Sequence, residues 1–485
     1  MSLSPSATSE KPEFISKFTK GYRFEPPKID YDVTREQLTG KSGVGNIIDL
    51  FTQSPQYTNL RGLLPERTSN SAYDSVQYAL CLLSGFWLGA DCLEDVEKYK
   101  RDPLLVTKLG GDKGRIPTAR AIGNWLRDFD EARLIDMNGF LSKQAISYRK
   151  HLKPGTPLVL DMDSTSHPQT GLKIEGVAWN YKDEWALDSL SCFDDMGLCY
   201  GFKLRGGSTH TSVGAVDMLT GIVSSVRESD PASKEAIYYR ADSGYCNESV
   251  FRACLNLGLK FTITANGNLQ WESGLRGLSE TAWKPWEYTF DEIKESKQKK
   301  KPLPAVEVAQ LFYTPTWAEN IRFKLVVKRE WIEFEEDGLL RGQGYWHHYG
   351  VLTNITDYLE SPQAILEHHC MRGNAENRIK AFKGDYDLRH LPCLKMNANH
   401  AYAMLGMVAL NFHRALSLVE DPRCPRFSKS FRERLINIPG RLVRHARALK
   451  IKIEEHWLEE VKRLHTAWHD PPQIMLTFKL RRSTA

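Results

Sequence analysis

The stretch HHCMRGNAENRIKAFK, residues 368–383, carries one acid between two bases, with Arg372, Glu376 and Lys383 at positions i, i+4 and i+11. On a helix these offsets fall on one face. A stripe of apolar residues lies beside this face, offset by about one position around the helix axis. One side of such a helix can pack against a sheet while the neighbouring side presents the charges. The same pattern is also typical of a solvated face with an Arg–Glu pair one turn apart, so other regions of the chain must decide.

Two further acids follow apolar runs that are typical of strands. Asp163 comes near the end of TPLVLDMDST (156–165), and Asp242 ends the strand-like IYYRAD (237–242). Active sites of open α/β sheets form outside the carboxyl ends of strands. We therefore expect Asp163, Asp242 and the acid of the helix, Glu376, to meet there. For each aspartate the alternative is a strand-end residue that only caps the following turn.

Three carboxylates suit hard cations such as Mg²⁺. Two such ions about 4 Å apart can activate an attacking oxygen and stabilise the leaving one in phosphoryl transfer. Arg372 and Lys383 would then bind backbone phosphates. Asp161 competes with Asp163, because both have the same strand parity and point to the same face. We favour Asp163, which lies at the strand end and precedes a polar Ser-Thr turn.

The elements that must position these residues change in character along the chain. The N-terminal third reads as helices, the segment around the two aspartates reads as strands with one helix, and a Trp- and Lys-rich segment then splits this α/β core. The expected organisation is a disordered lead-in (1–30), a helical N-terminal domain (31–152), a first core segment (153–266), a β-rich insertion (267–340), a second core segment (341–420) and a basic C-terminal region (421–485).

Charge is unevenly placed. The chain of 485 residues has a net charge of +5, whereas residues 421–485 alone hold 15 Lys+Arg and 7 Asp+Glu, which gives 15 − 7 = +8. A basic segment on a near-neutral body indicates a surface for a polyanion, and a solvated basic tail is the alternative. Arg441, Arg444 and Arg447 recur every three residues, so on a helix they would share one side and could contact phosphates.

Several classes of protein are excluded. The longest apolar stretch, YALCLLSGFWLG (78–89), is too short to span a bilayer, so we expect no membrane association. The nine cysteines form no CxxC pair, which favours reduced thiols and a cytoplasmic protein. The sequence contains no GxxxxGK[ST] loop for ATP and no GxSxG elbow of a serine hydrolase.

The combination of DST (163–165), RADSGY (240–245) and MRGNAENRIKAFK (371–383) resembles bacterial insertion-sequence transposases. These are cut-and-paste DDE enzymes whose third acid lies in a Tyr-Arg-Glu-Lys motif, spaced Y-x2-R-x3-E-x6-K. The last three positions of the motif match this chain, and the tyrosine position is His369, a departure from the pattern. Histidine can still donate to a phosphate. The resemblance extends from about residue 45 to 465.

The resemblance implies an α/β fold: a ribonuclease-H-like catalytic core split by a β-rich insertion, with a helical N-terminal DNA-binding or dimerisation domain and a basic helical C-terminal region. It also implies that Asp163, Asp242 and Glu376 hold two Mg²⁺ ions, for which Mn²⁺ can substitute. In related enzymes a tryptophan of the insertion stacks on a flipped base, and the candidates here are Trp271, Trp283, Trp286, Trp317 and Trp331.

The implied function is DNA transposition. Such an enzyme cleaves double-stranded DNA at the terminal inverted repeats of its element, with a hairpin intermediate in related enzymes, and transfers the freed ends to target DNA. Arg372, Lys383 and His369 would bind DNA phosphates. A homodimer is expected in the DNA complex because two ends must be held together, and the bacterial nucleoid is the expected location.

Three other interpretations remain open. A ribonuclease-H-like DNA nuclease would cut without joining. A DNA-binding protein derived from a transposase would keep the fold and lack the chemistry. A multidomain protein with an incidental pattern of acids would do neither.

Overall fold

The computed structural model describes residues 28–67, 72–171, 173–231, 235–334, 343–355, 361–386, 388–445 and 448–474. For six of these the backbone alone is described: Lys113, Asn268, Ala375, Glu376, His445 and Ala448. The chain forms two units, Met1–Gln37 and Leu38–Ala485. The predicted lead-in lies outside the described residues except for residues 28–30. The predicted boundaries at residues 152, 266, 340 and 420 fall inside the second unit and stay predictions.

The N-terminal region of the second unit is helical, as the sequence predicted. It contains α2 (Ser42–Thr52), α3 (Pro55–Arg61), α4 (Ser75–Leu88), α5 (Val96–Tyr99), α6 (Pro103–Leu109), α7 (Ala119–Leu126) and α8 (Glu131–Leu152). The longest of them, α8, shows why its ends lie where they do. Asp130 caps its first turn by accepting a hydrogen bond from the Arg133 amide, 2.8 Å away. Basic side chains complete its last turn, where they meet the negative end of the helix dipole.

The central sheet contains the strand order β5-β4-β2-β6-β7. Its strands are β2 (Val159–Pro168), β4 (Trp185–Asp194), β5 (Cys199–Arg205), β6 (Tyr238–Ala241) and β7 (Lys260–Thr264). Strand β4 is antiparallel to both β2 and β5, and β2, β6 and β7 are parallel. Two helices lie between strands in the chain, α9 (Ala215–Ser229) and α10 (Glu248–Asn256). A short strand, β3 (Ala178–Trp179), pairs with the start of β4. The fold is mixed α/β, as predicted.

The predicted insertion, together with the strand that follows it, extends this same sheet. From β7 the order continues to β11 (Gly344–Thr353), β10 (Phe323–Glu333), β9 (Val306–Tyr313) and β8 (Lys284–Pro285). All of these added pairings are antiparallel. The segment also contains α11 (Glu272–Leu275) and α12 (Phe290–Lys299). The sequence predicted β-rich structure here, and β10 begins with the apolar run FKLVV, which is buried on both faces of the sheet.

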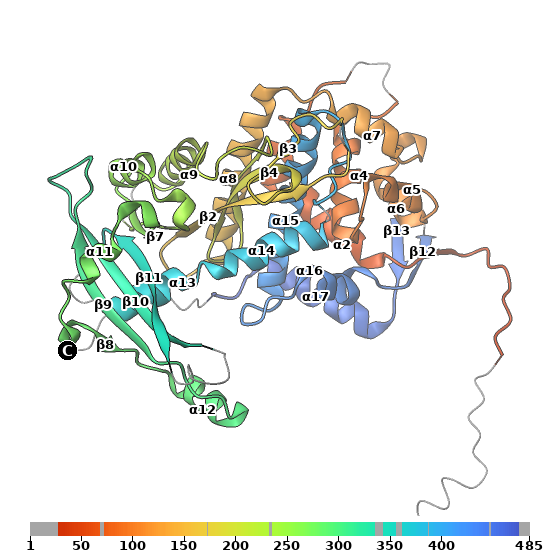
Figure 1. Cartoon of the computed structure of the whole chain (residues 1–485). Coiled ribbons are helices and arrows are strands. Elements are labelled where there is room, and N and C mark those ends of the chain that lie inside the picture. The colour runs from red at the N-terminus through yellow and green to blue at the C-terminus, as the bar shows by residue number, and fades with distance from the viewer. Residues whose placement is uncertain are drawn as a thin grey trace, which may run out of the picture. The chain divides into compact units, whose positions relative to one another are not determined.

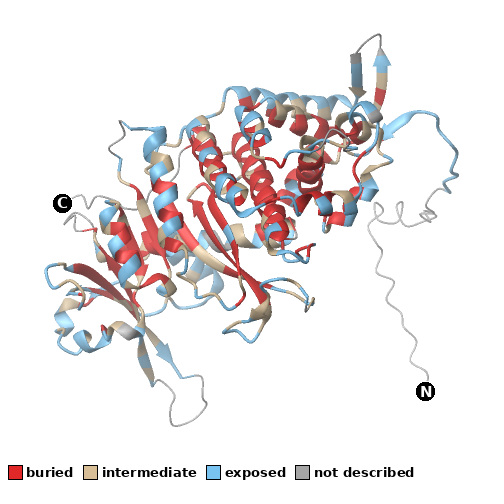
Figure 2. Ribbon diagram, turned by 90° about the horizontal axis from the view of Figure 1, so that it is seen from above, coloured by how far each residue is buried: buried red, intermediate tan, exposed pale blue. Residues whose placement is uncertain are grey.

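Three helices follow β11 and bring the chain back to the centre of the unit: α13 (Pro362–Cys370), α14 (Gly373–Asp385) and α15 (Met396–Glu420). Helix α15 crosses the middle of the unit, between the sheet and the N-terminal helices (Figure 1). It is long and apolar enough to cross a membrane, and 94% of its most apolar window is buried inside the protein. Buried residues concentrate in α15 and its neighbours, as Figure 2 shows. It is therefore the core helix of this unit.

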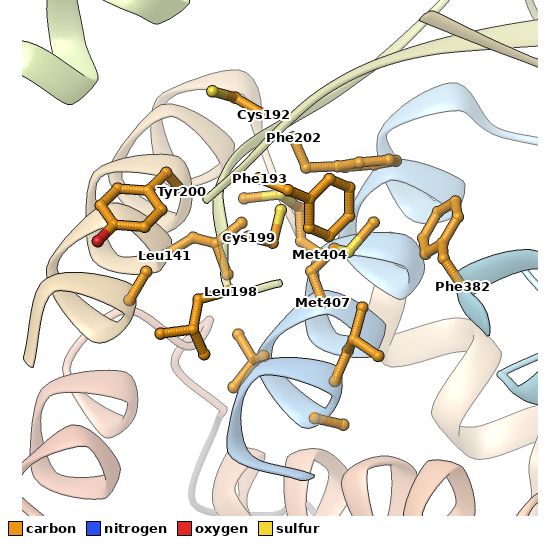
Figure 3. Packing of buried hydrophobic residues seen from close by; sticks show 14 of the residues in the cluster. Leu141, Cys192, Phe193, Leu198, Cys199, Tyr200, Phe202, Phe382, Met404 and Met407 are labelled. Carbon is orange, nitrogen blue, oxygen red and sulfur yellow. The ribbon is translucent and has the colours of Figure 1, made fainter. Parts of the chain in front are cut away.

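The core joins the sheet to α8, α14 and α15. Figure 3 shows Leu141 of α8, Phe202 of β5, Phe382 of α14 and Met404 of α15 packed around one apolar centre. The rings of Phe202 and Phe382 lie 5.5 Å apart between their centroids. Phe382 belongs to the apolar stripe predicted beside the charged face of α14. Packing on this side fixes the rotation of α14 about its axis.

The C-terminal region is only partly helical, which corrects the sequence prediction. It contains α16 (Ser428–Phe431), β12 (Gly440–His445), β13 (Ala448–Lys452) and α17 (Glu455–His469), and β12 and β13 pair as an antiparallel hairpin. A three-stranded sheet has the order β1-β12-β13, with β1 at Gln37–Thr39. The apolar residues Leu442 and Ile451 face one another across the hairpin. Each has polar or basic neighbours in the chain, and this alternation favours a strand over a helix.

Candidate active site

The two aspartates lie at the same level, Asp163 on β2 and Asp242 directly after the neighbouring parallel strand β6. Strand β2 pairs with β6 with Asp161 opposite Arg240, the last aligned pair between them. Two residues further along the chain come Asp163 and Asp242, and because the backbone of Asp242 is still extended, a step of two residues keeps both on the same face. The register of β2 and β6 therefore brings together the two acids that the sequence selected.

Asp161 and Arg240 form a buried ion pair below this point. Both nitrogens Nε and Nη2 of Arg240 donate to the Asp161 carboxylate, at 2.6 and 2.7 Å, and Asp161 is 3% exposed. The third nitrogen of Arg240 donates to the carbonyl of His368 at 2.8 Å. Both oxygens of Asp161 are thus engaged in a structural contact, which favours Asp163 as the chemically available acid of β2.

Asp163 is half-buried in the middle of β2, which corrects the expectation that it ends the strand. Strand β2 continues to Pro168 because its other edge still pairs with β4. The Oδ1 atom of Asp163 accepts from the Ser164 amide at 2.8 Å. Its Oδ2 atom lies 3.8 Å from a guanidinium nitrogen of Arg372. The edge of β2 toward β6 is open here because β6 has already ended.

Asp242 follows β6 directly, where the sequence placed it. Its Oδ1 atom accepts from the Gly244 amide at 2.9 Å and so caps a short 3-10 turn, Ser243–Tyr245. The pKa of the buried Tyr245 phenol is raised, first by burial and then by the charges of Asp163 and Asp242. Both carboxylates therefore lie close to one phenol, and a cation between them would relieve their repulsion.

Helix α14 carries the rest of the predicted motif. The helix from Pro362 is interrupted at Met371, and Arg372 stands at the N-terminal cap of α14. Arg372 faces Asp163, and Glu376 occupies the next turn of the helix. At the other end of α14, Lys383 donates to the carbonyl of Ser166 at 2.6 Å. The two bases thus fix α14 along β2 at two points.

His369 does not lie on this charged surface, contrary to its predicted contact with phosphate. It is 1% exposed, and its Nε2 and Nδ1 atoms lie 2.9 and 3.0 Å from the hydroxyls of Thr264 and Thr262. Burial, followed by the charge of Arg372, lowers its pKa to about 3. The side chain is a neutral core residue that joins α13 to β7.

Tyr349 is a residue of this site that the sequence reasoning missed. Its hydroxyl lies 3.0 Å from that of Thr264, the same hydroxyl that contacts His369. Burial raises the pKa of Tyr349, Asp242 raises it further and Arg372 lowers it. The half-buried phenol therefore lies near both charged groups. No sequence motif marks it, because it comes from β11, on the far side of the insertion.

The loop between β5 and α9 also borders the site. Arg205 donates to the carbonyls of Thr211 and Val213 at 3.1 and 2.6 Å and so fixes the loop. The Thr211 hydroxyl lies 3.4 Å from that of Ser164, next to Asp163. The polar run GGSTHTS in this loop was the available signal in the sequence.

The chemistry of the described donors fits a hard cation. Among the side chains that the structure describes, no group of three metal-ligating residues lies together, and Glu376 is outside that set. Two carboxylates at one level, with a basic side chain beside them, form a pair that Mg²⁺ would bind. Glu376 stands one turn beyond Arg372, on the helix that Arg372 anchors to Asp163.

The other predicted phosphate ligands lie in the C-terminal hairpin, far from this site. Arg441 and Arg444 are on β12, and Arg447 lies outside the described residues. The prediction that they share one side of a helix is wrong, because residues 441 and 444 point to opposite faces of a strand. Arg441 instead shares its face with Lys450 and Lys452 of β13. β12 and β13 lie at the opposite end of the unit from β9 and β10 (Figure 1).

Comparison with known protein families gives a match over most of the chain. A family model described as transposase DDE domain group 1 matches residues 58–468. This range includes β2, β6 and α14 and extends from the N-terminal helices to α17. No curated protein matches the chain.

Proposed function

The chain belongs to the family of transposases with a group 1 DDE domain, and on this premise we propose that it is an active cut-and-paste enzyme. It cleaves double-stranded DNA at the inverted-repeat ends of its element and joins the freed ends to target DNA. The observation that carries this proposal is the alignment of Asp163 and Asp242 at one level of two parallel strands, with the helix of Glu376 anchored beside them.

The strand order supports a ribonuclease-H-like core. The order β5-β4-β2-β6-β7 has three antiparallel strands followed by two parallel ones, with the acids at β2 and after β6. Sites of α/β sheets form where strand order reverses, and β2, the first of these strands in the chain, is where it reverses here. The antiparallel strands β9 and β10 then fall within the expected insertion, and β11 follows it in the chain.

Asp163, Asp242 and Glu376 are the residues that would hold two Mg²⁺ ions, with Mn²⁺ able to replace them. Bound there, the ions would supply activation of the attacking oxygen and stabilisation of the leaving one. The chain's own contribution is geometric. The backbone amides of Ser164 and Gly244 hold one oxygen of each aspartate, and this leaves less side-chain freedom to lose when a cation binds.

Arg372, Lys383 and Tyr349 would bind the DNA phosphates next to the acids. Arg372 presents a planar fork of donors beside Asp163, which suits a phosphate bidentately. Lys383 uses one of its three N–H groups on Ser166 and keeps two for DNA. Tyr349 replaces His369 in our proposal, because its phenol lies near Arg372 and His369 is buried.

The hairpin of β12 and β13 would bind DNA away from the acids. Arg441, Lys450 and Lys452 share one face of it, and both lysines are exposed. A two-stranded ribbon fits the major groove, and its basic face would follow the phosphates. A homodimer on DNA is part of the proposal, because one reaction must bring two ends together.

Strand transfer distinguishes this proposal from a nuclease. The purified full-length protein would be incubated with Mg²⁺, a labelled duplex that ends in the terminal repeat, and a supercoiled plasmid. We expect labelled ends joined to the plasmid, and no joined product from Asp163→Asn. Cut plasmid without joined label would instead favour a ribonuclease-H-like DNA nuclease. Binding with neither product would favour a DNA-binding protein derived from a transposase.

A further inference from the structure

A small cavity behind α14 is lined by basic side chains that no proposed step of the reaction uses. It has a volume of about 30 Å³ and lies among α14, α15 and the segment before α16. Its polar lining includes Arg378, His413, Arg414 and Arg426. Arg378 comes two residues after Glu376 on α14, which is about 200° round the helix. The cavity therefore lies on the reverse side of the helix that carries Glu376.

Two of the arginines lack a carboxylate of their own. Among the described residues, neither Arg378 nor Arg414 has an ion-pair partner. The acids whose charges act on Arg378 are Asp194 and Asp161, and Arg149 and Arg240 already bind these. Burial lowers the pKa of Arg378, and burial followed by the charge of Arg378 lowers that of Arg414 to about 9. The two like charges thus lie close together, and the carboxylates that act on them are already bound by other arginines.

Glycine at position 197 lets Arg378 enter the cavity wall. Gly197 has φ +84°, and a Cβ atom there would clash with Nε of Arg378. Arg414 is held from the same turn, because its Nε donates to the carbonyl of Met196 at 2.7 Å. The remaining N–H groups of both guanidinium groups are available to a ligand in the cavity.

His413 adds a buried imidazole to the cavity wall. The Tyr386 hydroxyl lies 2.8 Å from Nδ1 of His413. An anion in the cavity would favour the tautomer in which the phenol donates to Nδ1 and the imidazole proton lies on Nε2. Nε2 of His413 is buried and has no hydrogen-bond partner among the described residues. The side chain is 3% exposed and lines the cavity.

The third arginine is incompletely neutralised. Arg426 donates to Glu420 at 2.9 Å, and Glu420 is also contacted by Arg434 and Arg463, which both pair with Glu460 as well. Three guanidinium groups thus share two carboxylates. The surroundings of the cavity keep a positive excess, which a bound anion would offset.

We propose that this cavity binds a phosphate group, held by Arg378, Arg414 and Nε2 of His413. Its volume corresponds to about two water molecules, so it accepts a compact oxyanion at its mouth and excludes a nucleoside. The group is either a free phosphate ion or a phosphate of a DNA backbone. In both cases it contacts α14 from behind and stabilises the helix that carries Glu376.

The test is equilibrium dialysis of radiolabelled inorganic phosphate against the full-length protein, without DNA and without divalent metal. We expect about one phosphate per chain, and affinity at least about tenfold weaker in Arg378→Gln and Arg414→Gln. Lys380→Gln is the matched control, because it removes the same charge from an exposed position of α14. Its affinity should stay within about twofold of the wild type.

Two results would overturn the proposal: no saturable binding by the wild type, or equal losses in Arg378→Gln and Lys380→Gln. If Arg414→Gln fails to fold because its bond to Met196 is lost, Arg378→Gln still decides. A short DNA duplex added to the loaded protein distinguishes the sources. Displacement of the phosphate identifies a backbone phosphate as the occupant, and retention identifies a free ion. Because no cleavage is measured, failure of the proposed function would leave this test valid.

Discussion

Asp161 of β2 and Arg240 of β6 form a bidentate ion pair in which both oxygens of the carboxylate are bound, at 2.6 and 2.7 Å. This pair aligns the two parallel strands one step before Asp163 and Asp242. Two aspartates separated by one residue on the same strand thus have different roles. Asp161 fixes the register, and Asp163 lies at the open part of the strand where it can take part in chemistry.

Replacement of Asp161 should therefore reduce the stability of the fold, whereas replacement of Asp163 should reduce DNA cleavage. Asp161→Asn leaves the Arg240 guanidinium buried without a counter-charge and should lower the free energy of unfolding by about 3–5 kcal/mol. Asp163→Asn keeps an oxygen for the Ser164 amide and should change that free energy by less than about 1 kcal/mol. DNA cleavage by Asp163→Asn should fall by at least about a hundredfold. Urea unfolding and a cleavage assay measure the two effects. A folded, active Asp163→Asn would rule out this assignment.

The positions of His369 and Tyr349 predict a second contrast. His369→Phe leaves the hydroxyls of Thr262 and Thr264 without their imidazole partner and should lower the free energy of unfolding by about 1–3 kcal/mol. Affinity for DNA from the flanks of the gene should not change. Tyr349→Phe should keep the stability and weaken DNA binding about three- to tenfold. Fluorescence anisotropy checks the affinities. The reverse outcome would return His369 to the phosphate-binding set.

The basic face of the C-terminal hairpin should appear in the salt dependence of DNA binding. Each phosphate contact contributes a slope of about 0.9 to the fall of log Kobs with log salt. Replacing Arg441, Lys450 and Lys452 by Gln should reduce that slope by up to about 2.7. Filter binding at a series of salt concentrations gives the slope.

The matched control removes three charges elsewhere on the surface. The end of helix α12 and the residue after it offer three exposed lysines for this purpose, Lys297, Lys299 and Lys300. Their replacement by Gln tests whether net charge alone explains the effect. An equal reduction of the slope in both triple variants would contradict a specific role for the hairpin.

Buried histidines make the protein sensitive to acid. Burial lowers the pKa of His167, His368 and His369 to about 3 and that of His400 to about 4, from a usual 6.5. Below pH 6.5 the unfolded chain takes up protons that the folded chain cannot. The free energy of unfolding therefore decreases as the pH is lowered. Each such histidine contributes about 1.4 kcal/mol per pH unit. The buried carboxyls of Asp188 and Asp194, with pKa raised to about 6, oppose this trend.

A single substitution isolates one histidine from this balance. In His400→Met the slope of unfolding free energy against pH, between about pH 6 and about pH 4.5, should be shallower by about 1.4 kcal/mol per unit. Above about pH 7 the slopes of the two proteins should agree. Urea unfolding at a series of pH values measures both. Parallel curves over the whole range would show that His400 is accessible to protons in the folded state.

The sequence predicted those features of the site that depend on local pattern. Apolar runs ending in acids indicated β2 and β6, and the spacing of Glu376 and Lys383 matches helix α14. The parity of Asp161 and Asp163 could not distinguish them, because their difference comes from a partner, Arg240, on another strand. The sequence therefore supplied the candidates, and the pairing of strands favoured one of them.

Other features of the site depend on tertiary contacts that no local pattern contains. His369 fits the motif spacing, yet α13 packs against β7 and buries it. The recurrence of Arg441 and Arg444 suggested a helix, whereas the alternation of Leu442 with polar neighbours gives a strand. Tyr349 lies on β11, which follows the insertion in the chain. Each of these outcomes required knowledge of which segments lie side by side.

The most direct test of the proposed transposase activity uses a plasmid that carries the gene with its flanking DNA. The purified protein is incubated with this plasmid and Mg²⁺, with Glu376→Ala alongside, and the broken ends are mapped. We predict paired breaks at inverted repeats with the wild type. We predict none with Glu376→Ala, which should still bind the flanks. Binding of the flanks by the wild type without breaks, or breaks that persist in Glu376→Ala, would contradict the proposed activity and its assignment to these acids.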